Sequence, residues 1–287
     1  MTTLYHYCST TAFLNLVTER ALWLSSLSQS NDYMEGKLIS QSVARLAKKD
    51  QLSFEAIAKL QESLDLMESM FDGLGFCLSE EGDLLSQWRG YAADATGVAV
   101  GFDKTYLEWL SKPSRSGEVI GLNLDKVEYD MEAQDLLVTP TYNEMKRLVE
   151  NGALKRYGGR GLLDSRTNEQ IAEDNKAIIS ANMNLSFAAL RLFSHLFLLK
   201  SAAFKEEKEW RLVSYLIKRT ADTCSYRAAN GQIVPYRSYE LREMERSPIV
   251  NIILGPKHTT PTEVVKNFLA QNGFGEVNVV KSTASYR

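Results

Sequence analysis

The sequence contains little cysteine and no long hydrophobic run, and each shortage excludes a class of protein. Cys8, Cys77 and Cys224 lie far apart without a C-x-x-C pair, so neither a zinc site nor a disulfide framework is expected. The most apolar stretch, residues 185–199, is interrupted by serine, arginine and histidine and is too short to cross a bilayer. The first residues lack the pattern of a signal peptide. We therefore expect a protein of the reducing cytoplasm that binds neither a membrane nor a metal.

The sequence also lacks a large net charge and the common nucleotide-binding and catalytic motifs. The net charge is −3, with 24% charged and 44% hydrophobic residues, so no global basic field attracts nucleic acid. The motifs G-x-G-x-x-G, G-x-x-x-x-G-K-[ST], G-x-S-x-G and H-E-x-x-H do not occur. Dehydrogenases of the dinucleotide-binding fold, P-loop proteins, hydrolases with a nucleophile elbow and zinc proteases therefore lose support.

The hydrophobic pattern predicts a mixed α+β protein with a mostly antiparallel sheet. Short β-branched and aromatic runs alternate with helical patterns along the chain, and the length of 287 residues fits one elaborated domain, residues 1–287. Two helix-rich blocks, at about 37–72 and 141–203, are expected as insertions, the first split into two helices. A proline within a late strand pattern, Pro235, predicts an edge strand.

Charged residues crowd the start of a predicted strand in residues 204–215, FKEEKEWRLVSY. Because alternate residues of a strand share a face, Glu207, Glu209 and Arg211 are expected on one surface, with Trp210 and Leu212 on the other. One interpretation is a solvent-facing edge with a weak ion pair. The other is a glutamate held at the rim of a cleft and oriented by the arginine.

Two further groups are candidates for a site. His6 lies in the strand pattern LYHYC, where it is either a partly buried structural histidine or a functional one. Trp88 and Tyr91 are three residues apart in a predicted helix and therefore share a face. Aromatic residues at this spacing usually belong to a core, although Tyr91 also offers a flat face on which a planar ring can stack.

Several segments together resemble the bacterial family catalogued as domain of unknown function 2971. The resemblance covers nearly the whole chain. It rests on the Tyr-His-Tyr opening, on the Asn31-Asp32 pair with Glu35, on Trp88 and Tyr91 before a glycine, and on the alternation of glutamate and arginine after residue 206. Tyr33 stands where the resemblance leads us to expect proline. The family name implies no function.

A more distant resemblance does imply one. The order of His6 in a first strand, Tyr91 after a strand, serine and helix, and Glu209 in a late strand reading EWRLV is similar to the His-Tyr-Glu arrangement of ADP-ribosyltransferases. The resemblance implies that His6 binds a ribose hydroxyl of NAD, Tyr91 stacks on the nicotinamide, and Glu209 binds the 2'-hydroxyl. It also implies that Glu207 positions or deprotonates an acceptor, and that Arg211 contacts a phosphate or orients Glu209.

Other residues complete the NAD site expected from this resemblance. Tyr7, Ser79 and Trp88 are expected beside the cofactor-binding residues, and Tyr5, Tyr7 or Tyr33 is an alternative to Tyr91 as the stacking aromatic. The resemblance implies cleavage of the nicotinamide–ribose bond by a bacterial toxin or phage-defence effector, with a protein or nucleic acid as acceptor. The competing hypothesis is a module without enzymatic activity, which either senses NAD or another nucleotide or serves as an interaction module.

Overall fold

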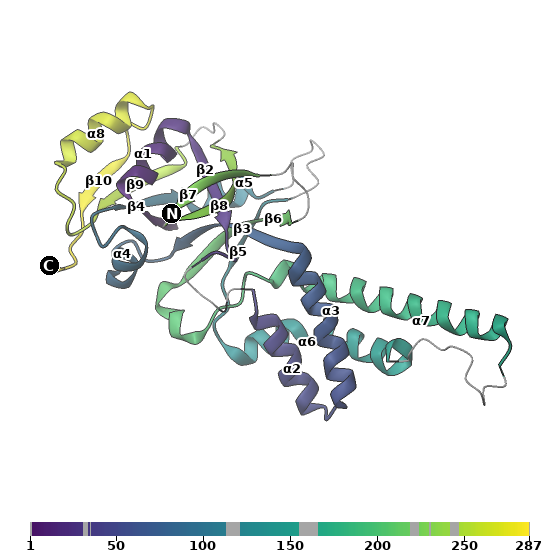
Figure 1. The fold of residues 1–287 in the computed structure, drawn as a ribbon. Helices are drawn as coiled ribbons and strands as arrows, with labels where there is room; N and C mark the ends of the chain where they lie inside the picture. The colour runs from purple at the N-terminus through teal and green to yellow at the C-terminus, as the bar shows by residue number, and fades with distance from the viewer. Residues whose placement is uncertain are drawn as a thin grey trace.

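A ten-stranded, mostly antiparallel sheet forms the centre of the protein, which confirms the predicted α+β class (Figure 1). The computed structural model describes residues 2–30, 34, 36–112, 121–154, 166–218, 224–229, 231–241 and 247–286. The strands are β1 (Thr3–Cys8), β2 (Ala21–Ser26), β3 (Phe71–Ser79), β4 (Val98–Asp103), β5 (Asn123–Lys126), β6 (Glu209–Ile217), β7 (Ser225–Ala229), β8 (Gln232–Glu240), β9 (Ile249–Leu254) and β10 (Asn278–Lys281). The helices are α1 (Thr10–Glu19), α2 (Leu38–Lys49), α3 (Phe54–Met70), α4 (Leu85–Tyr91), α5 (Lys104–Leu110), α6 (Met131–Leu148), η1 (Val149–Ala153), α7 (Asn168–Ala189), η2 (Leu190–His195), η3 (Ala202–Glu207) and α8 (Thr262–Gln271).

Strand β3 is the branching point of the sheet. The main path runs β10-β9-β4-β1-β3-β2-β8-β7, and β6 also pairs with β3 and carries β5 on its other side. Strand β1 meets β3 where Tyr5 pairs with Ser79, whereas β2 meets β3 further along, where Ser25 pairs with Gly75. Among the described residues, β1 and β2 therefore leave residues 76–78 between them without a strand partner on this edge. The sheet is split at this point.

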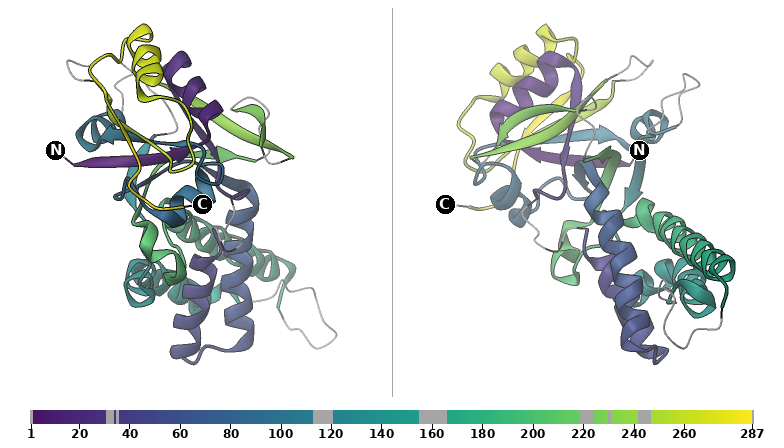
Figure 2. Two further views of the ribbon diagram at one scale, coloured as in Figure 1. Left: turned by 90° about the vertical axis from the view of Figure 1, so that its left-hand side faces the viewer. Right: turned by 45° about the vertical axis from the view of Figure 1, so that its right-hand side comes forward.

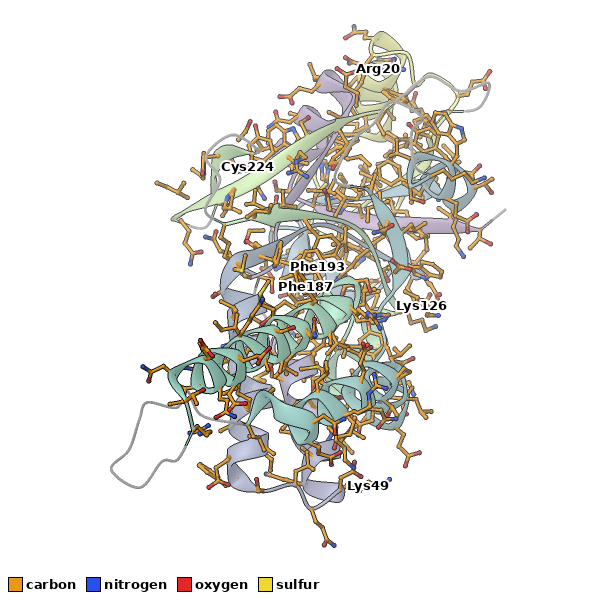
Figure 3. All side chains as sticks on the ribbon, turned by 90° about the vertical axis from the view of Figure 1, so that its right-hand side faces the viewer. Arg20, Lys49, Lys126, Phe187, Phe193 and Cys224 are labelled. Carbon is orange, nitrogen blue, oxygen red and sulfur yellow. The ribbon has the colours of Figure 1, made fainter. Side chains whose placement is uncertain are left out.

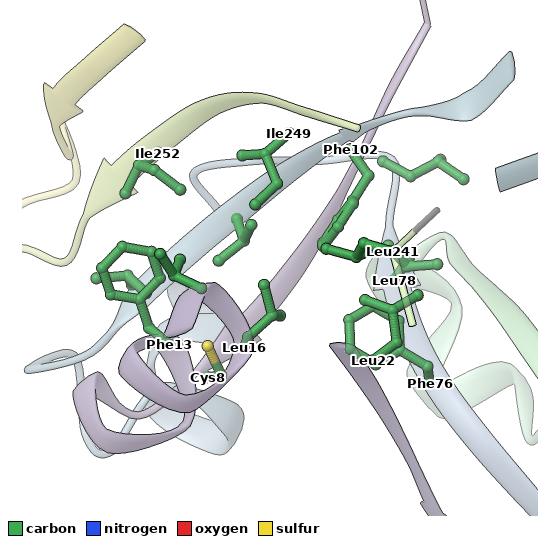
Figure 4. Close-up of a cluster of buried hydrophobic side chains, with 14 of the residues drawn as sticks. Cys8, Phe13, Leu16, Leu22, Phe76, Leu78, Phe102, Leu241, Ile249 and Ile252 are labelled. Atoms are coloured by element: carbon green, nitrogen blue, oxygen red, sulfur yellow. The ribbon is translucent and has the colours of Figure 1, made fainter. Parts of the chain in front are cut away.

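One face of the sheet carries the larger hydrophobic core, beneath helices α1 and α8. The side chain of Ser9 caps α1 by accepting a hydrogen bond from the backbone N–H of Ala12 at 3.2 Å. The helix then presents Phe13 and Leu16 to the sheet, in contact with the cluster shown in Figure 4. This core fixes β1 and the start of β2, the two strands that separate along β3.

A second cluster of buried side chains joins α2, α3, α6 and α7, which we call the helical lobe. These helices lie together at one end of the sheet, away from α1 and α8 (Figures 1 and 2). They account for most of the two helix-rich blocks, and Ser53 begins α3 as a cap after the predicted break. Phe187 and Phe193 lie near the junction of the lobe and the sheet (Figure 3). Among the described helices, none is long and apolar enough to span a membrane.

The prediction that Pro235 marks an edge strand is wrong. Strand β8 pairs with β2 on one side and with β7 on the other. Pro235 is paired with Tyr226 of β7. On the other side, the pairing of β8 with β2 ends at Tyr236, so β2 requires no backbone N–H from residue 235 and the proline is tolerated.

Candidate functional site

A cavity of about 650 Å³ opens where β1 and β2 separate along β3. Its wall takes residues from β1, α1, β2, β3, α4, the β7–β8 hairpin, η3 and β6. His6, Tyr91, Glu207 and Glu209 all line it, so four residues expected in one site from the sequence lie around one cavity. The cavity has the size of a typical small-molecule site.

Two carboxylates of the cavity belong to a buried cluster of four charged side chains. Lys200 Nζ donates to Glu207 Oε2 at 2.6 Å and to Glu209 Oε2 at 2.9 Å. Arg211 donates to both oxygens of Glu209, at 2.7 Å from Nε and 3.0 Å from Nη2. Lys200 is 3% exposed and Arg211 is 1% exposed. The interpretation as a solvent-facing ion pair is therefore wrong, because both partners of Glu209 are buried.

The backbone around the two glutamates differs from the predicted strand. Glu207 ends the 3₁₀-helix η3, and β6 begins only at Glu209. Between them Lys208 adopts a left-handed conformation, with φ of 44°. The side chains of Glu207 and Glu209 thus converge through this turn and through Lys200, and not by strand alternation. Alternation holds from Glu209 onward, where Arg211 lies on the same face of β6.

Residues 127–129 fix the backbone on both sides of this cluster. The backbone N–H of Val127 donates to the Glu209 carbonyl at 3.0 Å, and the N–H of Glu209 donates to Tyr129 Oη at 2.9 Å. The N–H of Lys200 donates to the Glu128 carbonyl at 3.0 Å. Because these bonds hold Lys200 and Glu209 to one segment, the backbone sets the separation at which their side chains meet.

The cluster keeps Glu209 ionised at every physiological pH. Burial alone raises the pKa of a carboxyl, but the charge and hydrogen bonds of Arg211, together with Lys200, lower the pKa of Glu209 to about 2. Burial likewise acts to lower the pKa of Lys200, and the neighbouring Glu209 outweighs it and raises that pKa. Two cations and two carboxylates therefore share one buried site without a net charge.

Tyr91 reaches the cluster from α4. Its hydroxyl donates to Glu207 Oε1 at 3.1 Å, and burial raises its pKa, so the hydroxyl keeps its proton. Helix α4 is held to β1 by the edge-to-face contact of Trp88 with Tyr7, at 4.8 Å between ring centroids. Trp88 Nε1 also donates to Asp83 Oδ1 at 2.7 Å. These contacts fix the helix and so the position of Tyr91.

His6 bridges the split between the strands. Its ring stacks on Phe76, and Nδ1 lies 2.8 Å from the Cys77 carbonyl oxygen. Burial lowers the pKa of His6 to about 4, so the ring is neutral at pH 7. Because a carbonyl only accepts, Nδ1 carries the proton and Nε2 is an acceptor. Among the described residues, Nε2 has no hydrogen-bond partner.

Acidification from pH 7 to pH 4.5 is expected to destabilise the protein through His6. The pKa is about 4 in the folded state and ordinarily 6.5, so the unfolded chain takes up this proton first. The contribution of neutral His6 to the free energy of unfolding is complete above pH 6.5. It decreases by on the order of 2 kcal/mol as the pH falls toward 4. Thermal unfolding should therefore show a smaller decrease for the variant His6→Gln than for the wild type.

Other groups set the background of this measurement. Burial also lowers the pKa of His195 and His258, so the variant should keep part of the decrease. The pKa of Glu209 is lowered from 4.5, so its contribution is lost only below that pH. An equal decrease in the wild type and in His6→Gln contradicts the assignment to His6.

Three residues expected to bind cofactor do not line the cavity. Arg211 lies behind Glu209, and its Nη1 donates to the Phe197 carbonyl at 2.7 Å. Ser79 is buried and donates through Oγ to the Glu207 carbonyl at 2.7 Å. Trp88 is fully buried in a small core. Each therefore supports a residue of the cavity wall, whereas Tyr7, also expected there, does line the cavity.

Some expectations fall on residues beyond those described. Asn31, Asp32, Tyr33 and Glu35, which carry part of the family resemblance, lie outside the described residues. Tyr5, an alternative stacking aromatic, is not part of the cavity wall, and its hydroxyl accepts a hydrogen bond from Asn251 Nδ2 at 3.3 Å. Tyr7 and Tyr91 are therefore the predicted aromatic residues at the cavity.

The sequence did not point to Lys200 or to Arg227. Lys200 directly follows the apolar run LFLL, so a charge at the edge of a buried segment was its one signal. Arg227 lies in β7 and lines the cavity. Lys200 contacts Glu207 through a turn that the pattern did not predict. Arg227 contacts Ser25, which lies in a distant part of the chain.

Comparison with known proteins gives a family without an assigned function. Among the described residues, no group of three or more His, Cys, Asp or Glu side chains is placed to hold a metal ion. No curated protein and no solved structure matches the chain. The family model described as Protein of unknown function (DUF2971) matches residues 87–212, which include Tyr91 and the four charged residues of the buried cluster. Over these residues the chain is similar to the DUF2971 family of proteins of unknown function.

Proposed function

We propose that the protein is an NAD-dependent ADP-ribosyltransferase or NAD glycohydrolase that cleaves the nicotinamide–ribose bond. The observation that carries the proposal is the shared cavity, which His6, Tyr91, Glu207 and Glu209 line from four different elements. These are the residues that the resemblance to ADP-ribosyltransferases singles out. Their convergence on one cavity supports the resemblance, because the sequence alone did not require it.

Glu209 has the properties that this chemistry needs. When the bond between C1' of the ribose and N1 of the nicotinamide breaks, its electron pair moves to N1, and the ribose acquires oxocarbenium character. A fixed carboxylate stabilises this positive charge more in the transition state than in the ground state. Glu209, with its pKa lowered to about 2 and both oxygens held by Arg211, is such a carboxylate.

The other residues have complementary roles in this proposal. His6 Nε2, an acceptor at neutral pH, receives a hydrogen bond from a ribose hydroxyl. The ring of Tyr91, a residue that is 39% exposed, forms a wall against the nicotinamide, while its hydroxyl donates to Glu207. Glu207 accepts the proton of the nucleophile as it attacks C1'. The nucleophile is water in a glycohydrolase and a protein or nucleic-acid acceptor in a transferase.

A specific observation favours a second candidate, a nucleotide-sensing module without turnover. Lys200 bridges Glu207 and Glu209 at 2.6 and 2.9 Å and, with Arg211, neutralises the cluster. A neutral cluster stabilises a developing cation less than an unpaired carboxylate does. The same cavity then holds the nucleotide intact.

One experiment distinguishes the two functions. Purified protein is incubated with NAD labelled in the nicotinamide, and the released label is measured together with ADP-ribose binding by thermal shift. We expect release of nicotinamide above that of heat-unfolded protein, together with a raised melting temperature in ADP-ribose. Binding without release supports the sensing module and removes the enzymatic proposal. The absence of both contradicts both functions.

A further inference from the structure

Among the described residues that line the cavity, Arg227 is the one lysine or arginine. It lies in β7, which pairs with β8 next to β2, so its side chain reaches the cavity from the side opposite to β6 in the strand order. Lys200 and Arg211 are near the cavity but do not line it, because Glu207 and Glu209 stand in front of them. Arg227 is thus the positive group that a ligand in this cavity meets directly.

Within the part of the chain that the structure describes, the guanidinium of Arg227 has a neutral hydrogen-bond partner, the hydroxyl of Ser25. Its Nε and Nη2 donate to Ser25 Oγ at 3.3 and 3.0 Å. Among the described residues, no carboxylate pairs with it, in contrast to Lys200 and Arg211, which both bind glutamates. Burial lowers the pKa of Arg227, as expected for a partly desolvated cation without a counter-ion. Such a guanidinium, with donors left over, suits the oxygens of a phosphate.

The rest of the cavity permits an anion beside Arg227. Arg227 and His6 line the same cavity, and the positive charge of Arg227 contributes to the lowered pKa of the His6 ring. The carboxylates of Glu207 and Glu209 are neutralised by Lys200 and Arg211, which reduces their repulsion of a phosphate. Ser25 and Gln232 add neutral hydrogen-bonding groups to the wall.

We propose that Arg227 forms an anion subsite of the cavity, which takes a phosphate or diphosphate group of a phosphorylated riboside. The inference rests on the proposed function for the nature of the riboside. It adds the residue that makes the cavity bind nucleotides more tightly than nucleosides. A phosphate at Arg227 places the attached ribose near His6 and directs the remainder of the ligand toward Glu207 and Glu209.

Titration of ligands with and without phosphate tests the subsite. The probes are inorganic pyrophosphate, ADP-ribose and nicotinamide riboside, measured by calorimetry on the full chain. In the variant Arg227→Gln, we expect the affinity for pyrophosphate and ADP-ribose to fall by about ten- to a hundred-fold, the loss of a charge-assisted hydrogen bond. The affinity for nicotinamide riboside should stay within about two-fold. Arg227→Lys, which keeps the charge, should retain part of the affinity for pyrophosphate.

A matched control and two outcomes make the test decisive. Arg147→Gln changes the net charge equally at an exposed position of α6 outside the cavity wall, and it should leave all three affinities unchanged. The subsite is contradicted if the wild type does not bind pyrophosphate, or if Arg227→Gln binds it as tightly as the wild type. Binding through Arg227 without nicotinamide release keeps the subsite and removes the proposed enzyme. Release of nicotinamide by the wild type, with unchanged affinities in Arg227→Gln, keeps the proposed enzyme and removes the subsite.

Discussion

Replacing Glu209 with glutamine is expected to slow nicotinamide release from NAD by about 10²- to 10³-fold. The variant keeps the volume and an oxygen that accepts from Arg211, but it removes the negative charge that the proposal places against the ribose. Because that charge acts mainly in the transition state, kcat should fall much more than the affinity for NAD. Single-turnover release of labelled nicotinamide measures the effect.

A nearby residue of the same segment offers a matched control for this variant. Glu206 is exposed and lies outside the cavity wall, so Glu206→Gln makes the same chemical change without touching the site. Glu209→Asp keeps the charge but withdraws it by one methylene, and an intermediate rate is expected. Unchanged release by a folded Glu209→Gln protein rules out the assigned role of Glu209 in turnover.

Replacing Lys200 with methionine is expected to lower the free energy of unfolding by about 3–5 kcal/mol. Methionine fills a similar volume, but Glu207 and Glu209 then lose the ammonium that contacts them at 2.6 and 2.9 Å. Both carboxylates are largely buried, at 7% and 5% exposure, so solvent in the cavity replaces the lost partner only in part. Urea unfolding at pH 7 measures the difference.

A control and a double variant separate the charge effect from lost packing. Lys205 is exposed in the same segment, and Lys205→Met should change stability by less than about 0.5 kcal/mol. The double variant Lys200→Met with Glu207→Gln removes one unpaired carboxylate, so it should be more stable than Lys200→Met alone. If Lys200→Met unfolds at the same urea concentration as Lys205→Met, the cluster does not stabilise the fold as expected.

The fold class and most elements could be predicted because they follow from local periodicity. The division of the first helix-rich block into α2 and α3 follows from the pattern in a short window of sequence. The alternation of Trp210 and Leu212 correctly placed them on the core side of β6, opposite Glu209 and Arg211. Pro235 was misjudged, because the pairing of β8 with β2 joins segments about 200 residues apart, which no local pattern reports.

The candidate site was predicted only in part. Glu209 and Arg211 were expected to be neighbours, and they are, because residues two apart in a strand share a face. Glu207 was expected beside them for the same reason, and it is near them for another: η3 and the left-handed Lys208 turn it toward Lys200. A single turn residue at positive φ breaks the strand periodicity on which the prediction depended.

The sequence by itself determined the α+β class, the two helix-rich blocks, the face of β6 that holds Glu209, and the candidate residues His6 and Tyr91. Only the tertiary structure decided that these residues surround one cavity, because β1 and β2 separate along β3 through long-range pairing. It also decided that Lys200 and Arg211 neutralise the two glutamates, while Arg227 meets the cavity without a carboxylate partner among the described residues. Charge pairing depends on distances in space, and those are fixed by the packed sheet and not by spacing along the chain.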